Sequence, residues 1–323
     1  MIGITLGDPG GIGPEIVFKT FASQPISFNY VLFGAKSILS HPLIRQYAKK
    51  LPLTIIRDYN EINQRPDNLL FFDCGELPIP FCIGSPNAIN GKASYTFIMT
   101  ALQAVNQQLI TGIVTAPICK ESFQMAGIPY KDHTSLLKIE TQSRRVSMAF
   151  YTPRLKTVLA TIHIPYRDVP DALTADAILT AYENSRLFST YLGLLSPKIA
   201  IAGLNPHAGE NGLFGDEEQR YLLPVIEQLA TEGKPLLGPI PADTLYHRAA
   251  QGEFDIVISL YHDQALIPIK LLGFFDAVNI TLGLPFLRTS PDHGTAFELA
   301  YQDRASLDSF KAALRFLEKY QKK

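Results

Sequence analysis

Residues 4–22 read ITLGDPGGIGPEIVFKTFA, and this stretch decides the fold class. An apolar run leads directly into a turn that contains Gly10, Gly11 and Gly13, which permit tight or left-handed backbone. Pro14 then suits the first turn of a helix, where no backbone N–H is needed. The pattern predicts a strand that passes through a short turn into a helix. The start of such a helix can hold an anion, and a turn without a ligand is an equally good interpretation.

Short apolar runs of this kind recur along the chain, with helical patterns between many of them. Residues 91–110 are long enough for a helix of about five turns. Near the C-terminus, Phe310, Ala313, Leu314 and Leu317 form one apolar stripe at helical spacing. Strands that alternate with helices predict an α/β architecture with a largely parallel sheet. The strand-like runs are ITLG, NYVLFG, LLFFD, GIVTAPI, VSMAFYT, TVLATI, KIAIAGL, FDIVISL and AVNITLGL.

The length of the chain predicts two domains. A chain of 323 residues is long enough for two ordinary cores, and it contains no low-complexity linker and no repeat. Crossing strands rather than a flexible tether should therefore join the domains. We expect residues 1–135 and 295–323 to form the first α/β domain and residues 136–294 to form the second.

Composition and charge exclude several classes of protein. The chain has a net charge of −1 with no basic block or stripe, which argues against nucleic acid as a partner. No apolar run approaches the roughly 18 residues that span a bilayer, and the N-terminus lacks the pattern of a signal peptide. The wide spacing of Cys74, Cys82 and Cys119 suits neither a disulfide framework nor a thiolate zinc site. We expect a cytoplasmic protein without a membrane segment.

Three of the seven histidines follow three separate strand-like runs. His163 follows TVLATI, His207 lies in the loop after KIAIAGL, and His262 follows FDIVISL. In parallel sheets, ligands bind beyond the carboxyl ends of the strands, and imidazole is the commonest protein ligand for divalent metals. Any one of these histidines alone is better explained as the end of a strand, but the repeated position favours a shared cleft. Asp263 could orient the ring of His262 or bind metal itself.

Two further clusters contain groups that bind anions. Residues 131–134, KDHT, place an imidazole and a hydroxyl at a predicted helix start, where an anion is favoured. The alternative is that Asp132 or Thr134 is simply the N-cap. Lys270 and Arg288 lie in markedly apolar surroundings and would hold a carboxylate or a phosphate well, although a single cation is more often a solvated surface charge.

Several motifs that would indicate other enzymes are missing from the sequence. Neither G-x-G-x-x-G nor G-x-x-x-x-G-K-[ST] occurs, so a nucleotide would have to bind without those loops. The missing fingerprint disfavours a Rossmann-type reductase. Without G-x-S-x-G or H-E-x-x-H, a serine hydrolase and a zincin protease are also disfavoured.

Eight segments, in order from residue 7 to about residue 300, closely resemble the PdxA family of 4-hydroxythreonine-4-phosphate dehydrogenases. The resemblance implies two α/β/α domains with a cleft between them, similar to isocitrate and isopropylmalate dehydrogenases rather than to a Rossmann domain. It also implies oxidation of 4-phosphooxy-L-threonine at C3 by NAD, with NADP as the alternative. Loss of CO2 would then give 3-amino-2-oxopropyl phosphate, in the biosynthesis of pyridoxal 5′-phosphate. The segments are GDPGGIGPE, TAPICK, DHT, ATIH, GLNPHAGENGLFGDEE, GPIPADT, YHDQALIPIK and VNITLGLPFLRTSPDHGTA.

The resemblance also implies roles for individual residues. His163, His207 and His262 would hold one divalent cation (Zn, Mg, Co or Mn), with the ligands shared across a homodimer interface. The cation would act as a Lewis acid at the C3 oxygen. Lys120, Asp243 and a metal-bound water are the candidate bases. The second domain would carry most of the metal and substrate residues and the dimer interface. The implied substrate contacts are His133, Thr134, Lys270, Asn279 and Arg288.

The chain departs from the family pattern at two places. The family usually has Gly-His-Thr-Glu where this chain has residues 132–135, DHTS, and Cys119 stands where a polar residue is more usual. These changes bear on phosphate handling and on substrate choice. Paralogues that act on threonate or erythronate 4-phosphate are the alternative within the enzyme class. A metal-dependent binding protein without turnover is the alternative outside that class, and the full set of site residues counts against it.

Overall fold

The computed structural model describes residues 1–64 and 68–320, and the chain divides into two compact units. One unit contains Met1–Gln142 and the described residues from Leu284 onward, and the other contains Ser143–Gly283. The sequence placed these divisions at 135/136 and 294/295. They fall elsewhere because helix α6 (His133–Glu140) stays whole within the first unit, and strand β12 (Leu287–Pro291) pairs with that unit's β5.

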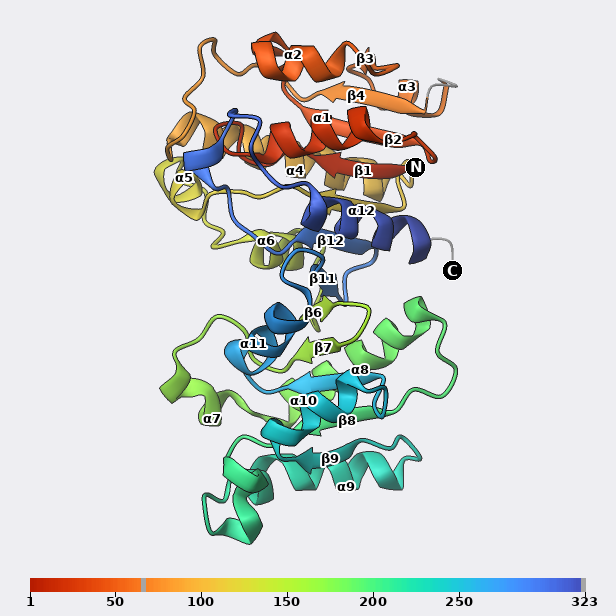
Figure 1. Cartoon of the computed structure of the whole chain (residues 1–323), viewed down its shortest axis with the longest axis vertical. Coiled ribbons are helices and arrows are strands. Elements are labelled where there is room, and N and C mark those ends of the chain that lie inside the picture. The colour runs from red at the N-terminus through yellow and green to blue at the C-terminus, as the bar shows by residue number, and fades with distance from the viewer. Residues whose placement is uncertain (65–67, 321–323) are drawn as a thin grey trace. The chain divides into compact units, whose positions relative to one another are not determined.

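The first unit contains a parallel sheet with the strand order β3-β4-β2-β1-β5-β12. Helices connect its strands, as an alternating strand and helix pattern predicts (Figure 1). Its elements are β1 (Ile2–Thr5), α1 (Gly13–Ser23), β2 (Tyr30–Gly34), η1 (Lys36–Ser40), α2 (Pro42–Ala48), β3 (Thr54–Ile56), α3 (Asn60–Gln64), β4 (Leu69–Asp73), α4 (Ala88–Asn106), β5 (Gly112–Thr115), α5 (Lys120–Met125), α6, β12, η5 (Phe297–Leu299) and α12 (Asp308–Tyr320).

The N-terminal strand, turn and helix form as the sequence predicts. Strand β1 is wholly buried, and α1 begins at Gly13 with Pro14 in its first turn. A side chain at Gly13 would place its Cβ 2.2 Å from the carbonyl oxygen of Leu6, so close packing of the turn on the strand requires glycine there. Near the C-terminus, the predicted apolar stripe of α12 is fully buried, which confirms that helix. The stripe consists of Phe310, Ala313, Leu314 and Leu317.

The second unit contains a mixed sheet with the strand order β11-β6-β7-β10-β8-β9. Strands β7, β10, β8 and β9 run parallel, whereas β6 is antiparallel to both β7 and β11. Its elements are β6 (Ser147–Tyr151), β7 (Lys156–Leu159), η2 (Tyr166–Asp168), α7 (Val169–Ala172), α8 (Ala175–Leu192), β8 (Ile199–Ala202), η3 (Pro206–Gly212), η4 (Glu218–Leu222), α9 (Leu223–Thr231), β9 (Leu237–Ile240), α10 (Ala242–Ala250), β10 (Ile256–Ser259), α11 (His262–Gly273) and β11 (Val278–Leu282).

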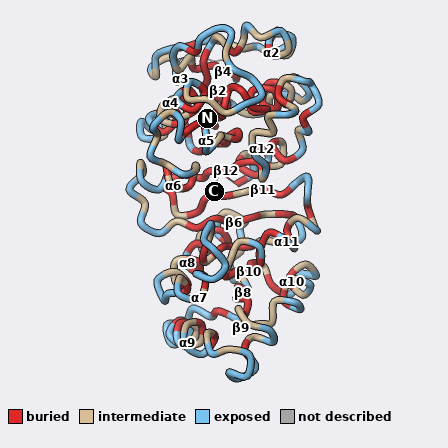
Figure 2. Tube along the Cα trace, turned by 90° about the vertical axis from the view of Figure 1, so that its left-hand side faces the viewer, coloured by how far each residue is buried: buried red, intermediate tan, exposed pale blue. Residues whose placement is uncertain are grey.

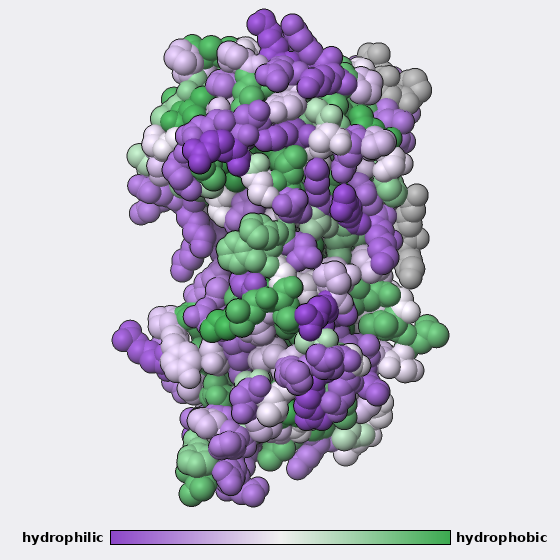
Figure 3. All heavy atoms as spheres, viewed as in Figure 1, coloured by the Kyte–Doolittle hydropathy of each residue, from purple (hydrophilic) through white to green (hydrophobic). Residues whose placement is uncertain are grey.

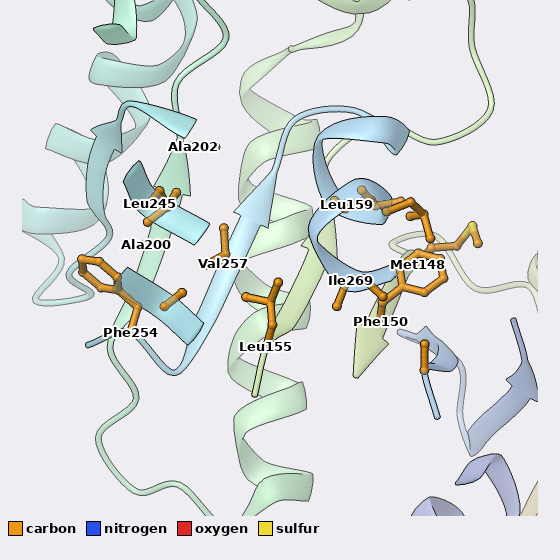
Figure 4. Packing of buried hydrophobic residues seen from close by; sticks show 14 residues of the cluster. Met148, Phe150, Leu155, Leu159, Ala200, Ala202, Leu245, Phe254, Val257 and Ile269 are labelled. Carbon is orange, nitrogen blue, oxygen red and sulfur yellow. The ribbon is translucent and has the colours of Figure 1, made fainter. Parts of the chain in front are cut away.

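The core of the second unit lies between its central strands and the helices that cover them. Val257 of β10 and Ala200 of β8 pack in one cluster with Leu245 of α10 and Ile269 of α11 (Figure 4). The central strands are buried along most of their length, whereas the edge strand β9 is not, and exposed residues gather on the helices and loops (Figure 2). This pattern explains the nearly continuous apolar runs, because both faces of each central strand are covered. Within residues 1–64 and 68–320, no helix combines the length and apolarity that a membrane span requires.

Candidate active site

The three histidines that follow strand-like runs come from three neighbouring strands of the second unit. Strand β10 pairs in parallel with β7 on one side and with β8 on the other, so their carboxyl ends meet at one edge of the sheet. His163 follows β7, His207 lies in η3 after β8, and His262 begins α11 after β10. The topology thus places these loops side by side, as expected for a site beyond the carboxyl ends of parallel strands.

His163 and His262 lie together. Their ring centroids are 5.5 Å apart, and both rings line a pocket of about 310 Å³ with Tyr166 and Tyr261. The Nδ1 atom of His262 lies 2.7 Å from Oδ1 of Asp263, the acid that the sequence placed beside it. A carboxylate on one ring nitrogen orients the ring and directs its other nitrogen toward a ligand.

The spacing of His163 and His262 fits a shared divalent cation. Two imidazoles bound to one tetrahedral metal through bonds of about 2.1 Å would have centroids about 5 Å apart, near the observed value. The ring of His207, on the third strand end, lies 5.9 Å from that of Phe214. Among the described residues of this one chain, no group of three or more His, Cys, Asp or Glu side chains is arranged to hold a metal ion. The family resemblance divides the ligands between two chains. A cation held jointly by His163, His207 and His262 therefore stays a prediction.

The strand ends that carry the histidines are connected by buried hydrogen bonds. Gln264 accepts from the N–H of Leu260 at 2.6 Å and donates to the carbonyl of Gly203 at 2.8 Å. The hydroxyl of Thr161, which precedes His163, donates to the carbonyl of Leu260 at 2.6 Å. The three loops are therefore fixed to one another. In the sequence Gln264 is one of the polar residues that follow the run FDIVISL, but its role in connecting these loops was not predicted.

A buried guanidinium lies in the first unit, at the end of its sheet. Arg288 on β12 is only 3% exposed, and its Nε and Nη2 donate to the hydroxyl of Thr115 on β5 at 3.1 and 2.6 Å. Burial lowers the pKa of Arg288 to about 10, and the negative charge of Asp132 opposes that shift. The side chain therefore stays protonated at neutral pH. Sequence reasoning missed Thr115, which ends the apolar run GIVT.

The departure at residues 132–135 builds the start of α6. The side chain of Asp132 accepts from the N–H of Ser135 at 2.8 Å, and the hydroxyl of Ser135 accepts from the N–H of Asp132 at 3.1 Å. This is a reciprocal capping box, so the N-cap interpretation of Asp132 is confirmed. The cap fixes the first two residues of the helix, His133 and Thr134, and Thr134 is buried.

His133 carries a buried nitrogen with no protein partner. Its Nε2 is inaccessible and has no hydrogen-bond partner among the described residues, although the residue as a whole is only partly buried. Burial, and secondarily the charge of Arg288, hold the pKa of His133 well below its usual range, against the opposing effect of Asp132. A neutral imidazole near a buried guanidinium can bind an oxygen ligand, because both groups can donate hydrogen bonds.

The remaining predicted residues are divided between the two units. In the second unit, the Lys270 ammonium lies 5.2 Å from the ring centre of Phe274, and the buried Oδ1 of Asn279 has no hydrogen-bond partner among the described residues. Of the candidate bases, Lys120 is an exposed residue that begins α5 in the first unit. Asp243 is exposed in the first turn of α10 in the second unit. The structure gives neither of these two a contact that singles it out as a base.

Both acids of the segment GDPGGIGPE accept hydrogen bonds from within the protein, although the buried Oε2 of Glu15 has no partner among the described residues. The buried carboxylate of Asp8 accepts from the N–H of Gly10 and the hydroxyl of Ser122, both at 2.9 Å. Burial raises the pKa of Asp8, and these hydrogen bonds oppose that shift. The wholly buried Glu15 occupies the first turn of α1 and accepts from the N–H of Ala305 at 3.2 Å. An anion at this helix start would face two buried acids, so the interpretation without an anionic ligand is favoured.

These observations define an α/β protein with clusters of polar side chains in each of its two units. The family model described as pyridoxal phosphate biosynthetic protein PdxA matches residues 27–317. The chain belongs to this family.

Relatives of known name match almost the full length of the chain. A 4-hydroxythreonine-4-phosphate dehydrogenase of Beijerinckia indica is 40% identical over 98% of this chain and 93% of its own. A D-threonate 4-phosphate dehydrogenase of Pectobacterium atrosepticum is 39% identical over 98% of this chain and 97% of its own. The crystal structure of a 4-hydroxythreonine-4-phosphate dehydrogenase from Klebsiella pneumoniae has a TM-score of 0.87 at 38% identity, covering 99% of each chain. The predicted α/β fold class is thus confirmed.

Proposed function

We propose that this chain is a metal-dependent dehydrogenase that oxidises C3 of 4-phosphooxy-L-threonine with NAD. The resulting β-keto acid would lose CO2 to give 3-amino-2-oxopropyl phosphate, in the biosynthesis of pyridoxal 5′-phosphate. Family membership and the relative at 40% identity support this proposal. The structural observation that carries it is the pairing of His163 and His262 in one pocket at neighbouring strand ends.

In this proposal, His163, His207 and His262 hold one divalent cation, with Zn, Mg, Co and Mn as candidates. When bound, such a cation supplies a Lewis acid that stabilises negative charge on the C3 oxygen. Asp263 keeps the ring of His262 oriented through the contact at Nδ1. Tyr166 and Tyr261 line the same pocket as the two imidazoles.

The substrate's charged groups would be bound by the polar residues of the sites described above. Arg288 offers a buried donor that is charged at neutral pH, and His133 offers a neutral imidazole whose buried Nε2 has no partner among the described residues. The helix start that carries Thr134 adds backbone N–H groups, which favour a phosphate. Lys270 and Asn279 supply a cation and an amide on the second unit. NAD, or NADP, would bind through loops other than G-x-G-x-x-G, and Lys120 and Asp243 are the side chains to test as bases.

A second candidate substrate is D-threonate 4-phosphate, which has a hydroxyl where 4-phosphooxy-L-threonine has an ammonium group. The relative at 39% identity bears that activity in its name. The cap residue Asp132 argues for the other substrate. Its negative charge lies close enough to Arg288 and His133 to affect the pKa values of both. A carboxylate at this position favours a substrate that carries a positive charge, which is why we place 4-phosphooxy-L-threonine first.

The test is an NAD-reduction assay on both substrates with metal-free protein and with each candidate cation. We expect NADH to form from 4-phosphooxy-L-threonine with the higher kcat/KM, to disappear on chelation and to return when the cation is restored. A higher kcat/KM for D-threonate 4-phosphate would assign the second function. Full activity in the chelated protein would overturn metal dependence.

We further propose that the chain forms a homodimer with a shared site. Helix α11, which begins at His262, presents Ile267 and Leu271 to solvent at 60 and 82% exposure, and Phe274, which caps its C-terminus, is 64% exposed. Their i, i+4, i+7 spacing gives one apolar stripe, and hydrophobic surface is visible over α11 in Figure 3. An exposed apolar patch of this kind marks an interaction surface. A second copy of the chain would place this helix, and the histidine at its start, at the interface.

A further inference from the structure

The loop that carries His207 has a left-handed shape. His207, Ala208, Glu210 and Asn211 have φ angles of 53, 52, 41 and 58°, and Gly209 between them has φ of 80°. L-residues other than glycine are disfavoured in this conformation, because their Cβ lies too close to the following carbonyl oxygen. Four such residues in one turn do not stabilise themselves. Contacts from outside the turn must hold it in this shape.

Those contacts come from the carboxylate of Glu218, which is only 2% exposed. Its Oε1 accepts from the backbone N–H groups of Leu204 and Asn205, both at 2.8 Å. Its Oε2 accepts from Nδ2 of Asn205 at 3.0 Å. A Cβ at Gly209 would lie 2.7 Å from the same Oε2, so the carboxylate fills the inside of the turn. A buried carboxylate that accepts three N–H donors is a strong anchor, because each bond is charge-assisted.

We propose that Glu218 is a positioning residue for His207: its carboxylate holds the left-handed turn that presents this imidazole to the divalent cation. The inference rests on the proposed function, which makes His207 a metal ligand. Of the neighbouring acids, Glu217 shares the Nδ2 donor, and neither acid accepts from the described backbone N–H groups of Leu204 and Asn205. Glu217 bonds only Nδ2 of Asn205, at 2.7 Å, and Asp216 is exposed and pairs with Arg220 at 3.5 Å.

The first test is the affinity of metal-free protein for Co²⁺, measured by calorimetric titration of the Glu218→Gln variant. The substitution keeps the shape of the side chain but replaces one carboxylate oxygen with an NH2 group. This NH2 group would face an N–H donor that the carboxylate accepts from in the parent. Loss of an outer partner of a metal ligand typically weakens metal binding 10–100-fold, and we expect about that loss. The matched control is Asp216→Asn, which removes one charge from the same acidic cluster and should bind Co²⁺ as the parent does.

A double-mutant cycle separates positioning from a general structural effect. If Glu218 acts through His207, Glu218→Gln should weaken Co²⁺ binding in the parent and change nothing in a His207→Ala background. Equal losses in both backgrounds would overturn the positioning role, as would a Glu218→Gln variant that binds like Asp216→Asn. An unchanged Co²⁺ affinity in His207→Ala alone would instead overturn the ligand assignment in the proposed function.

A second variant guards against failure of Glu218→Gln to fold. Asn205→Ala removes the Nδ2 donor, which Glu218 shares with Glu217, and leaves the Glu218 carboxylate with its two backbone donors. We expect a smaller, few-fold loss of Co²⁺ affinity that is again absent in the His207→Ala background. Hydrogen exchange at the amides of Leu204 and Asn205 should accelerate in Glu218→Gln and not in Asp216→Asn. Unchanged exchange at both amides in a folded Glu218→Gln variant would show that the carboxylate does not hold the turn.

Discussion

In the first unit, the planar guanidinium of Arg288 donates two hydrogen bonds to the hydroxyl of Thr115. The guanidinium stays charged despite its burial. Lysine at this position would keep the charge but present one point donor on a flexible stem. The identity of the side chain should therefore matter more than its charge.

We expect Arg288→Lys to raise the KM for the phosphorylated substrate at least about 10-fold, the equivalent of roughly one charge-assisted hydrogen bond. The KM for NAD should stay nearly unchanged, because the cofactor would contact other loops. Steady-state kinetics with each substrate varied in turn measures both values. The control is Arg57→Lys, an arginine of the same unit whose side chain is 74% exposed and bonds Asp73. If KM and kcat for the phosphorylated substrate are unchanged in Arg288→Lys, Arg288 has a structural role only.

His133 makes the stability of the protein depend on pH. Below pH 6.5 this imidazole is protonated in the unfolded chain but stays neutral in the folded chain. Burial and the charge of Arg288 keep its pKa in the folded chain well below 6.5. The free energy of unfolding therefore has its full value above pH 6.5 and falls as the pH drops through the range below it. For one group the slope is at most about 1.4 kcal/mol per pH unit.

Urea unfolding at pH 7.5 and pH 5.5 measures this contribution. Between pH 7.5 and pH 5.5 we expect the free energy of unfolding of the parent to fall by about 1 kcal/mol more than that of the His133→Gln variant. His41, whose pKa is also lowered by burial, is present in both proteins and cancels in the comparison. Equal losses in the two proteins would show that His133 titrates normally when the chain is folded.

At the scale of elements, Gln264 at the start of α11 connects two loops that carry predicted metal ligands. It satisfies the N–H of Leu260 and the carbonyl of Gly203, and all three residues are buried. We expect Gln264→Leu to lower the free energy of unfolding by about 2–5 kcal/mol, because each buried group left without a partner costs about 1–3 kcal/mol. Denaturant unfolding measures the change, with the exposed Gln219→Leu as the control. A loss below about 1 kcal/mol would mean that these groups find other partners.

The elements were predictable where the signal is local. Residues 310–317 are adjacent in sequence and show their apolar stripe directly, and the strand ends before His163 and His262 stand out as short buried runs. The contacts that arrange the site are not local. Thr115 and Arg288 are 173 residues apart, and Gln264 and Gly203 are 61 apart. The pairing of strands brings the residues of each pair together, and the order of the strands cannot be predicted from the sequence of any one segment.

The left-handed turn after β8 was hidden from sequence reasoning for a different reason. Its glycines and Pro206 predict a loop, but four of its residues adopt positive φ without being glycine. Their conformation depends on the buried Glu218, which in the sequence is one acid among several in the run GDEE. A buried anchor cannot be told from a solvated acid by its type or its neighbours alone.

At the scale of the whole molecule, the second unit exposes an apolar stripe beside a predicted metal ligand. Leu271 is 82% exposed and Phe274 is 64% exposed on α11, and His262 stands at the other end of that helix. Burial of these side chains by a second copy would stabilise a dimer by about 25 cal/mol per Å² of apolar surface, less the entropic cost of association. In a symmetric dimer the same stripe appears on both chains, so one substitution changes the interface twice.

We therefore expect Leu271→Asp, alone or with Phe274→Asp, to give a monomer that has lost NAD-reducing activity. The introduced carboxylates would be desolvated and close to each other at the interface, which opposes association by several kcal/mol. Both parent side chains are exposed in the single chain, so the substitutions should leave the fold of that chain intact. Light scattering and activity should be measured on the same samples across a dilution series, and parent activity should fall where its dimer dissociates. The control is Leu195→Asp, which changes a leucine that is 95% exposed outside α11 and should leave both mass and activity unchanged. A monomeric variant with full specific activity would show that one chain completes the site, and the third metal ligand would then have to be sought within that chain.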